Sequence, residues 1–239
     1  RQADNHARLP SEYNNDNFPL YYQENWEPDF TCTFAQRFGD IKDDVKFWVC
    51  DPHRIPLLSN VRRTSQGKHD PCLIYSIASA GNHGFERSLH LLNEFGGTCE
   101  IHVFDARSQN EIDLDDHAEL EHIKFHYNWK IRGSQEDSSK GSHTLEEVVE
   151  TLGHKGRTID ILAVNCEGCE WRIFRDWFKI PAYPLQILVE VHGQPKVADE
   201  FFQTHQDNGF VTFHKDMNYA TMAKAYQYSF LKLNLLDTP

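Results

Sequence analysis

Four polar side chains that could take part in chemistry lie at the ends of two apolar runs in the second half of the sequence: Asn165, Glu167, Glu190 and His192. The two glutamates and the histidine are capable of proton transfer, and the asparagine of hydrogen bonding. The first pair follows the run 159–164, and the second pair ends the run 185–192. In an open α/β sheet, polar groups at the carboxyl ends of buried parallel strands face the ligand crevice. If the two runs are neighbouring strands, we expect these four side chains to meet there.

The chemistry predicted for this group is proton transfer from a hydroxyl nucleophile, with His192 or Glu167 as the general base. The glutamates could also bind a substrate or a divalent cation, which leaves a metal-dependent hydrolase as a weaker possibility. The structural alternative is that Asn165 and Glu167 begin a loop and cap the next helix, while His192 is a hydrogen-bonded histidine at the edge of the core.

A second candidate site is the loop between the apolar run 72–77 and the helical pattern of residues 85–95. Its small residues, among them Gly81 and Gly84, allow backbone amides to approach a ligand, and the following helix offers its positive N-terminus. The loop lacks the G-x-G-x-x-G pattern, so an ordinary strand-to-helix turn is an equal alternative.

Asp105 ends the next apolar run, 100–104, and lies 28 residues after Ile77. A carboxylate in this position can accept hydrogen bonds from both ribose hydroxyls of a nucleoside. We therefore expect Asp105 to bind a ribose, the alternative being an aspartate that begins a turn.

The cysteines allow several interpretations; they are Cys32, Cys50, Cys72, Cys99, Cys166 and Cys169. Cys50 and Cys72 flank a polar, Arg-rich loop that a disulfide could close, whereas Cys99 and Cys166 are expected to be buried thiols in or beside strands. Cys166-x-x-Cys169 suggests zinc or a redox pair, but a zinc site needs two more ligands and the sequence has no second cysteine pair. We therefore predict no metal site.

The elements that must position these residues alternate between strand and helix from residue 72 onward. The expected strands are residues 72–77, 100–104, 123–127, 159–164, 185–191, 210–214 and 226–233. Helices are expected at 85–95, after the capping box of Thr144, after Cys169, and at 197–208. This alternation predicts an α/β fold with a doubly wound, mostly parallel sheet of Rossmann-like type. Only 11 residues separate the last two strands, so they should form a C-terminal antiparallel hairpin.

The chain has 239 residues, which is enough for one large domain and its core. We expect a polar N-terminal arm over residues 1–45 and the main domain over 46–239. Residues 1 to about 30 should form an extended arm or a poorly ordered lead-in, and residues 31–70 a helical cap before the main sheet. The net charge of −12 argues against a nucleic-acid partner. There is no run of 18 apolar residues in the sequence.

Four blocks, in this order, resemble the FkbM-type methyltransferases and their eukaryotic methyltransferase-like branch: CLIYSIASAGNHGFE, CEIHVFDAR, LGHKGRTIDILAVNCEGCEW and LQILVEVHG. The resemblance covers roughly residues 50–233. It implies a class I fold that uses S-adenosyl-L-methionine (SAM) and O-methylates a hydroxyl of a small molecule or glycan. It also implies a secretory-pathway or extracellular location, with a membrane anchor outside this chain; a cytoplasmic location is the alternative.

By this resemblance, the first loop and its flanks line the amino-acid end of the cofactor, at Ser76, Ala78, Ser79, Gly81, Gly84 and Glu86. Asp105 would hold the ribose. The residues facing the acceptor would be Asn165, Glu167, Glu190 and His192.

This sequence departs from the family pattern at four positions. The family usually has Lys and Asp where this chain has Ala163 and Asn165, and Ser-Phe-Gly-Ser where it has Ser76-Ile77-Ala78-Ser79. The methyl group of Ala78 lies where the cofactor should approach most closely, and the charge pair of the reactive strand end is missing. The alternative to an enzyme is therefore a catalytically inactive methyltransferase-fold subunit that binds a protein partner in a larger assembly.

Overall fold

The computed structural model describes residues 18–39, 46–62, 67, 69–78, 83–108, 123–193, 196–221 and 224–233. Within them, a seven-stranded sheet has the order β10-β11-β9-β8-β3-β4-β5. The strands are β3 (Cys72–Ala78), β4 (Cys99–Asp105), β5 (Ile123–Tyr127), β8 (Thr158–Val164), β9 (Tyr183–His192), β10 (Phe210–Met217) and β11 (Ala225–Lys232).

Strand β11 runs antiparallel to both of its neighbours, β9 and β10, while the pairs from β9 to β5 are parallel. The predicted doubly wound sheet and its C-terminal antiparallel hairpin are confirmed. Every strand expected from the apolar runs is present, because runs of buried Val, Ile and Leu suit the interior of a parallel sheet.

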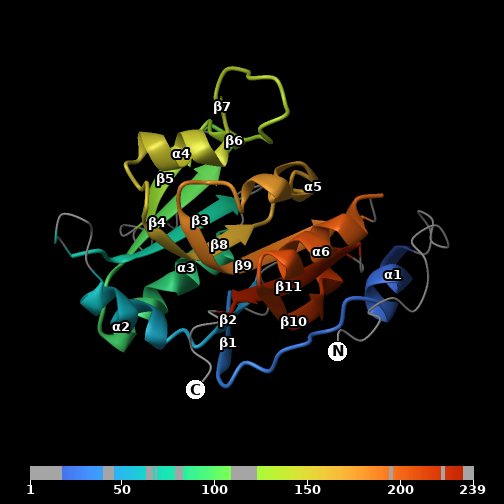
Figure 1. The fold of residues 1–239 in the computed structure, drawn as a ribbon, viewed down its shortest axis with the longest axis horizontal. Coiled ribbons are helices and arrows are strands. Elements are labelled where there is room, and N and C mark those ends of the chain that lie inside the picture. The colour runs from blue at the N-terminus through green and yellow to red at the C-terminus, as the bar shows by residue number, and fades with distance from the viewer. Residues whose placement is uncertain are drawn as a thin grey trace.

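Helices cover both faces of the sheet (Figure 1). One face packs against α1 (Phe18–Glu24), α4 (Leu145–Thr151), α5 (Glu170–Ile173), η5 (Phe174–Asp176) and α6 (Ala198–Asp207). The other packs against α2 (Arg54–Val61), α3 (Gly84–Ser88), η2 (Leu89–Phe95) and the hairpin of β1 (Ala35–Phe38) and β2 (Phe47–Cys50). Two further short strands, β6 (Lys130–Ile131) and β7 (Ser142–His143), pair with each other, and η6 (Tyr219–Thr221) precedes β11.

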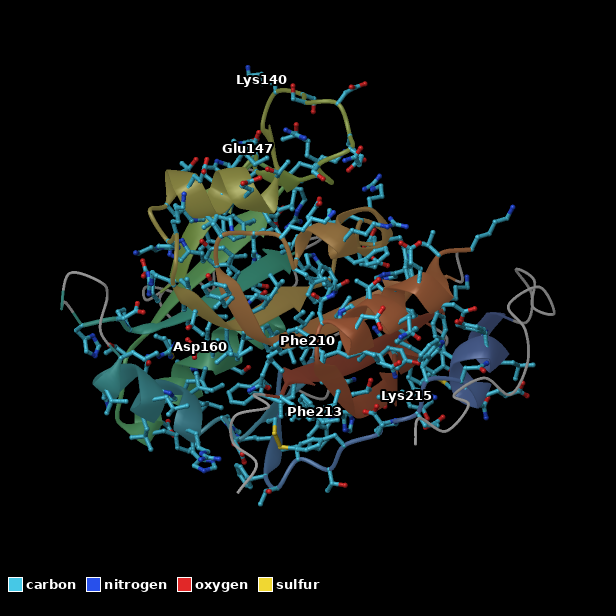
Figure 2. All side chains as sticks on the ribbon, in the orientation of Figure 1. Lys140, Glu147, Asp160, Phe210, Phe213 and Lys215 are labelled. Atoms are coloured by element: carbon cyan, nitrogen blue, oxygen red, sulfur yellow. A yellow bond between two sulfur atoms is a disulfide. The ribbon has the colours of Figure 1, made fainter. Side chains whose placement is uncertain are left out.

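The loop between β6 and β7 projects from the body of the fold and carries Lys140 (Figure 2). Among the described residues, no helix combines the length and the hydrophobicity needed for a membrane-spanning segment.

The expected extended arm differs from the structure over the part that is described. Helix α1 carries Tyr21 and Tyr22, both completely buried, and Trp26 stacks on Phe202 of α6 with ring centroids 4.6 Å apart. Lys215 of β10 donates a hydrogen bond to the carbonyl of Asn25, at 3.1 Å, and ties this segment to the sheet. The aromatic residues of this otherwise polar segment therefore pack against the core, and part of the segment is helical.

The helical cap expected over residues 31–70 is replaced by the β1–β2 hairpin followed by α2. Gln186 of β9 fixes this hairpin to the sheet, because its side-chain amide accepts a hydrogen bond from Cys50 N at 2.9 Å and donates one to Cys50 O at 2.8 Å. The hairpin lies over a buried face of the sheet, which the local pattern of the sequence does not reveal.

The disulfide considered possible between Cys50 and Cys72 is not formed, and the buried thiols expected at Cys99 and Cys166 are wrong. The structure pairs Cys32 with Cys50, Cys72 with Cys99, and Cys166 with Cys169. The physical reason is placement: Cys72 and Cys99 face each other in the parallel pair β3–β4, whereas the hairpin brings Cys50 back to Cys32.

Candidate active site

The carboxyl ends of four neighbouring strands meet at one edge of the sheet. Ala78 of β3 lies opposite Asp105 of β4, and Ile77 lies opposite Val164 of β8. Just beyond β8, Asn165 N donates a hydrogen bond to Ile77 O at 2.9 Å. The sheet therefore brings the loop after β3, Asp105 and the β8 end to the same edge.

A pocket of about 170 Å³ opens at this edge. It is lined by Ile77, Phe104, Asp105, Ala106, Arg107, Trp129, Lys130, Ile131, Cys166, Cys169 and Arg172. The lining is largely apolar and aromatic, with a few polar groups, as in sites for small organic ligands. The Cys166–Cys169 disulfide forms part of this wall, so these cysteines are neither zinc ligands nor free thiols in the structure.

Asp105 ends β4 beside this pocket and is buried, with 1 % of its surface exposed. Both of its carboxylate oxygens accept hydrogen bonds from Arg107: Oδ1 from the backbone N at 2.8 Å and from Nε at 3.2 Å, and Oδ2 from NH2 at 2.7 Å. The carboxylate is thus placed where the sequence predicts a ribose contact, but an arginine of the chain engages it. A ribose could take its place only if the Arg107 side chain moves.

Ser76 of β3 and Glu86 of α3 form a buried polar pair. Ser76 Oγ donates to Glu86 Oε1 at 2.5 Å, while Glu86 Oε2 has no hydrogen-bond partner among the described residues and His83 Nδ1 lies 3.9 Å from it. Burial raises the pKa of Glu86 to about 7, although the Ser76 bond works in the opposite direction. A carboxylate oxygen left without a hydrogen bond is suited to receive a cationic group of a ligand.

His192 lies at the end of β9 between two buried carboxylates. Its Nδ1 is 3.1 Å from Glu170 Oε1, and its Nε2 is 3.3 Å from Glu190 Oε1. Burial alone would lower the pKa of His192, but the hydrogen bonds and charges of the two glutamates outweigh it and raise this pKa to about 10. The imidazole is therefore protonated at neutral pH and can accept a proton from a substrate only after losing its own.

Glu190 is fixed from its other side as well. Asn218 Nδ2 donates to both of its carboxylate oxygens at 3.0 Å, and Gln227 Nε2 of β11 donates to Oε2 at 2.8 Å. The backbone of His192 is fixed too, since its N–H donates to Glu170 Oε1 at 2.9 Å and its carbonyl accepts from Trp171 Nε1 at 2.9 Å. The end of β9 is a rigid, hydrogen-bonded platform.

Glu170 is a residue of the candidate site that sequence reasoning missed. It is completely buried and contacts His192, whereas Glu167 is exposed and has a φ of 51° in the tight turn before α5. The sequence places two glutamates three residues apart after the strand, and an acidic residue in a first helical turn is ordinary. The inward direction of Glu170 is set by the turn at Glu167 and Gly168, since Gly168 N donates to Glu170 Oε2 at 2.8 Å.

The remaining predicted residues divide between described and undescribed parts of the chain. Asn165 is buried at the end of β8, and its Oδ1 has no hydrogen-bond partner among the described residues. Gly84 is the first residue of α3 and is buried. Ala78 ends β3, but its side chain is not described, and Ser79 and Gly81 lie outside the described residues. The predicted approach of loop amides to a ligand therefore stays a prediction.

Comparison with protein families gives a match over nearly the whole chain. A family model described as a methyltransferase domain matches residues 2–232. A comparison with curated protein sequences finds no match.

Similar solved structures include two fibrillarins. One, from Aeropyrum pernix with natively bound SAM, is 10 % identical, covers 85 % of each chain and has a TM-score of 0.43. The other, a pre-rRNA processing protein from Methanococcus jannaschii, is 11 % identical, covers 87 % of this chain and 98 % of its own, and has a TM-score of 0.43.

Proposed function

Because this chain belongs to the methyltransferase-domain family, we propose that it binds SAM at the carboxyl edge of its sheet and methylates a hydroxyl of a small molecule or glycan. The observation that carries this proposal is Asp105, a buried carboxylate at the end of β4 beside a largely apolar pocket. A carboxylate there suits the two hydroxyls of a ribose.

The residues at this edge fit the chemical groups of SAM. Asp105 would accept hydrogen bonds from the ribose hydroxyls. The buried Glu86 Oε2, to which no described residue donates a hydrogen bond, would pair with the ammonium of the amino-acid end. When bound, SAM supplies a methyl group on a sulfonium, which an oxygen nucleophile can take. Phe104 and Ile77 line the pocket beside Asp105 and would exclude water from the ligand.

The ends of β8 and β9 would receive the acceptor. The side-chain oxygen Oδ1 of Asn165 could accept a hydrogen bond from the hydroxyl of the methyl acceptor and orient it. His192, held between Glu170 and Glu190, would position the acceptor as a cationic donor at neutral pH. It becomes a base only in its deprotonated form, which is the minor form below a pH of about 10.

A catalytically inactive role is the second candidate, favoured by two specific observations. Arg107 occupies both oxygens of the carboxylate that a ribose would need. The strand that leads to the site also has Ala163 and Asn165 where the resembling family usually has Lys and Asp. Under this hypothesis the chain keeps the methyltransferase fold and serves a binding role in an assembly.

Calorimetric titration with SAM and with S-adenosylhomocysteine separates the two hypotheses. We expect both ligands to bind the wild-type chain, Asp105→Asn to weaken binding at least about tenfold by removing an anionic acceptor, and Arg107→Ala to strengthen it by freeing Asp105. Asp137→Asn, the same change at an exposed aspartate, is the matched control. No heat of binding at millimolar concentrations of either ligand, in the wild type and in Arg107→Ala, would contradict cofactor binding and leave the inactive role.

A further inference from the structure

A group of metal-ligating side chains lies away from the candidate active site, in the first half of β4. Glu100 and His102 come from this strand, and His154 comes from the turn after α4. The Nε2 atoms of both histidines face the same carboxylate oxygen, Glu100 Oε1, at 3.1 Å for His102 and 3.7 Å for His154. The three ligand atoms lie within 4.8 Å of one another.

Each of these three groups is also oriented by a second partner. His102 Nδ1 is 2.8 Å from His126 Nε2, and His154 Nδ1 is 2.7 Å from the Tyr75 hydroxyl. Metal-binding histidines typically have their other ring nitrogen engaged in this way, which fixes the ring and its tautomer. The two Nε2 atoms are therefore directed at a common point by their surroundings.

The second oxygen of Glu100 is engaged as well. Arg157 NH1 donates to Glu100 Oε2 at 2.6 Å, while its Nε donates to Asp70 at 2.8 Å. A carboxylate held through one oxygen presents its other oxygen as a single ligand, an arrangement that ligating carboxylates share.

The distances from the two histidines to the carboxylate oxygen are close to those of a tetrahedral metal site. Ligand atoms about 2.0–2.1 Å from a Zn²⁺ ion lie roughly 3.3 Å from each other. The observed 3.1 and 3.7 Å therefore need only small side-chain movements, and the two Nε2 atoms lie within 4.8 Å of each other. The histidines are buried, with 2 % and 5 % of their surfaces exposed, and the 19 % exposure of the Glu100 side chain leaves a path from solvent.

A lysine now supplies positive charge at this point. Lys124 Nζ lies 2.5 Å from Glu100 Oε1, the oxygen that both histidines face. The Lys124 side chain is 60 % exposed, so it can move into solvent at little cost. A metal ion and this ammonium would compete for the same oxygen.

We propose that Glu100, His102 and His154 bind a divalent transition-metal ion of the Zn²⁺ type, with Lys124 as the group that the ion displaces. Two imidazoles and one carboxylate form a donor set that zinc accepts, with water completing the coordination. Glu100 precedes Asp105 by five residues, about 16 Å along the strand, so the site is separate from the pocket. Its role is structural: the ion would fasten the turn after α4 to β4.

Calorimetric titration of the metal-stripped chain, carrying no histidine tag, with ZnCl₂ tests this proposal. We expect one site that His102→Gln and His154→Gln each weaken at least about tenfold and that Tyr75→Phe weakens about 10- to 100-fold through the orientation of His154. Lys124→Gln should tighten binding severalfold, because it removes a competing charge. His90→Gln, at an exposed histidine, is the matched control and should bind as the wild type does.

Zn²⁺ should also raise the melting temperature of the wild type but not of His154→Gln. Circular dichroism shows whether each variant is folded, and Tyr75→Phe and Lys124→Gln keep the test decisive if a ligand variant does not fold. Equal Zn²⁺ affinity in the wild type, His154→Gln and Tyr75→Phe would overturn the proposal. SAM titration of the same variants reports on the pocket separately.

Discussion

At the scale of single residues, the pair Glu170–His192 shows how one side chain can change the chemistry of a site. The predicted base, His192, is present at the end of β9, but two carboxylates hold it as a cation. Glu167, the predicted alternative, is exposed and belongs to the turn. The catalytic roles of these residues stay predictions, and the sequence analysis missed Glu170, the neighbour that helps to keep His192 protonated.

The raised pKa of His192 makes its contribution to stability dependent on pH. Its pKa is about 10 in the folded protein against 6.5 as the ordinary value, so the folded state binds the proton more tightly. The stabilisation is therefore complete below pH 6.5 and disappears as the pH rises through about 10. We expect His192→Gln to lower the free energy of unfolding by about 2 kcal/mol at pH 6.

Urea unfolding of the wild type and of His192→Gln at pH 6 and at pH 10 measures this dependence. The difference between the two proteins should shrink at pH 10, while His90→Gln should show no such trend. A difference that stays constant or grows with pH would show that the two glutamates do not hold a protonated imidazole.

At the scale of elements, the capping box before α4 is the clearest agreement between sequence and structure. Thr144 Oγ1 accepts from Glu147 N at 3.2 Å, and Glu147 Oε2 accepts from Thr144 N at 2.7 Å. A local motif is predictable because its partners are three residues apart and need no help from the rest of the fold.

We expect Thr144→Ala to lower the free energy of unfolding by about 1 kcal/mol. The substitution removes the hydrogen bond from Glu147 N to Thr144 Oγ1 and weakens the one from Thr144 N to Glu147 Oε2. Thr151→Ala, at the exposed end of the same helix, should change it by less than about 0.5 kcal/mol. Thermal or urea unfolding measures the stability of the two variants. Equal losses of stability would mean that the capping box contributes little to the free energy of unfolding.

Other elements depart from what their local patterns indicate. The helix expected over residues 85–95 is α3 followed by the 3₁₀ segment η2, and β1 and β2 were not foreseen. The β1–β2 hairpin is stabilised by Gln186 and by a buried face of the sheet. The residues within the hairpin do not indicate these contacts.

At the scale of the whole molecule, the segment 18–38 belongs to the packed body of the protein. Tyr22 donates to Gly193 O at 2.5 Å, directly after His192, so α1 lies against the end of β9. Trp26 donates through Nε1 to the Tyr21 hydroxyl at 2.9 Å and stacks on Phe202. The N-terminal segment thus supports both the core and the platform of the candidate site.

We expect Trp26→Ala to lower the free energy of unfolding by about 3–5 kcal/mol, because a buried ring is replaced by a cavity. Leu20→Ala in α1, at a side chain that is 42 % exposed, should cost less than about 1 kcal/mol. Urea unfolding distinguishes them. A Trp26→Ala protein as stable as Leu20→Ala would show that this segment is a dispensable arm.

The sequence by itself determined the order of strands and helices from residue 72 onward, the C-terminal hairpin and the position of Asp105, because hydrophobic period, connection length and strand ends are local properties. Only the tertiary structure decided the disulfide pairs, the ion pair of Arg107 with Asp105, the approach of Glu170 to His192 and the burial of α1. Most of these features depend on which side chains face each other across strands or in turns. The distances between those side chains are fixed by the packing of the whole chain.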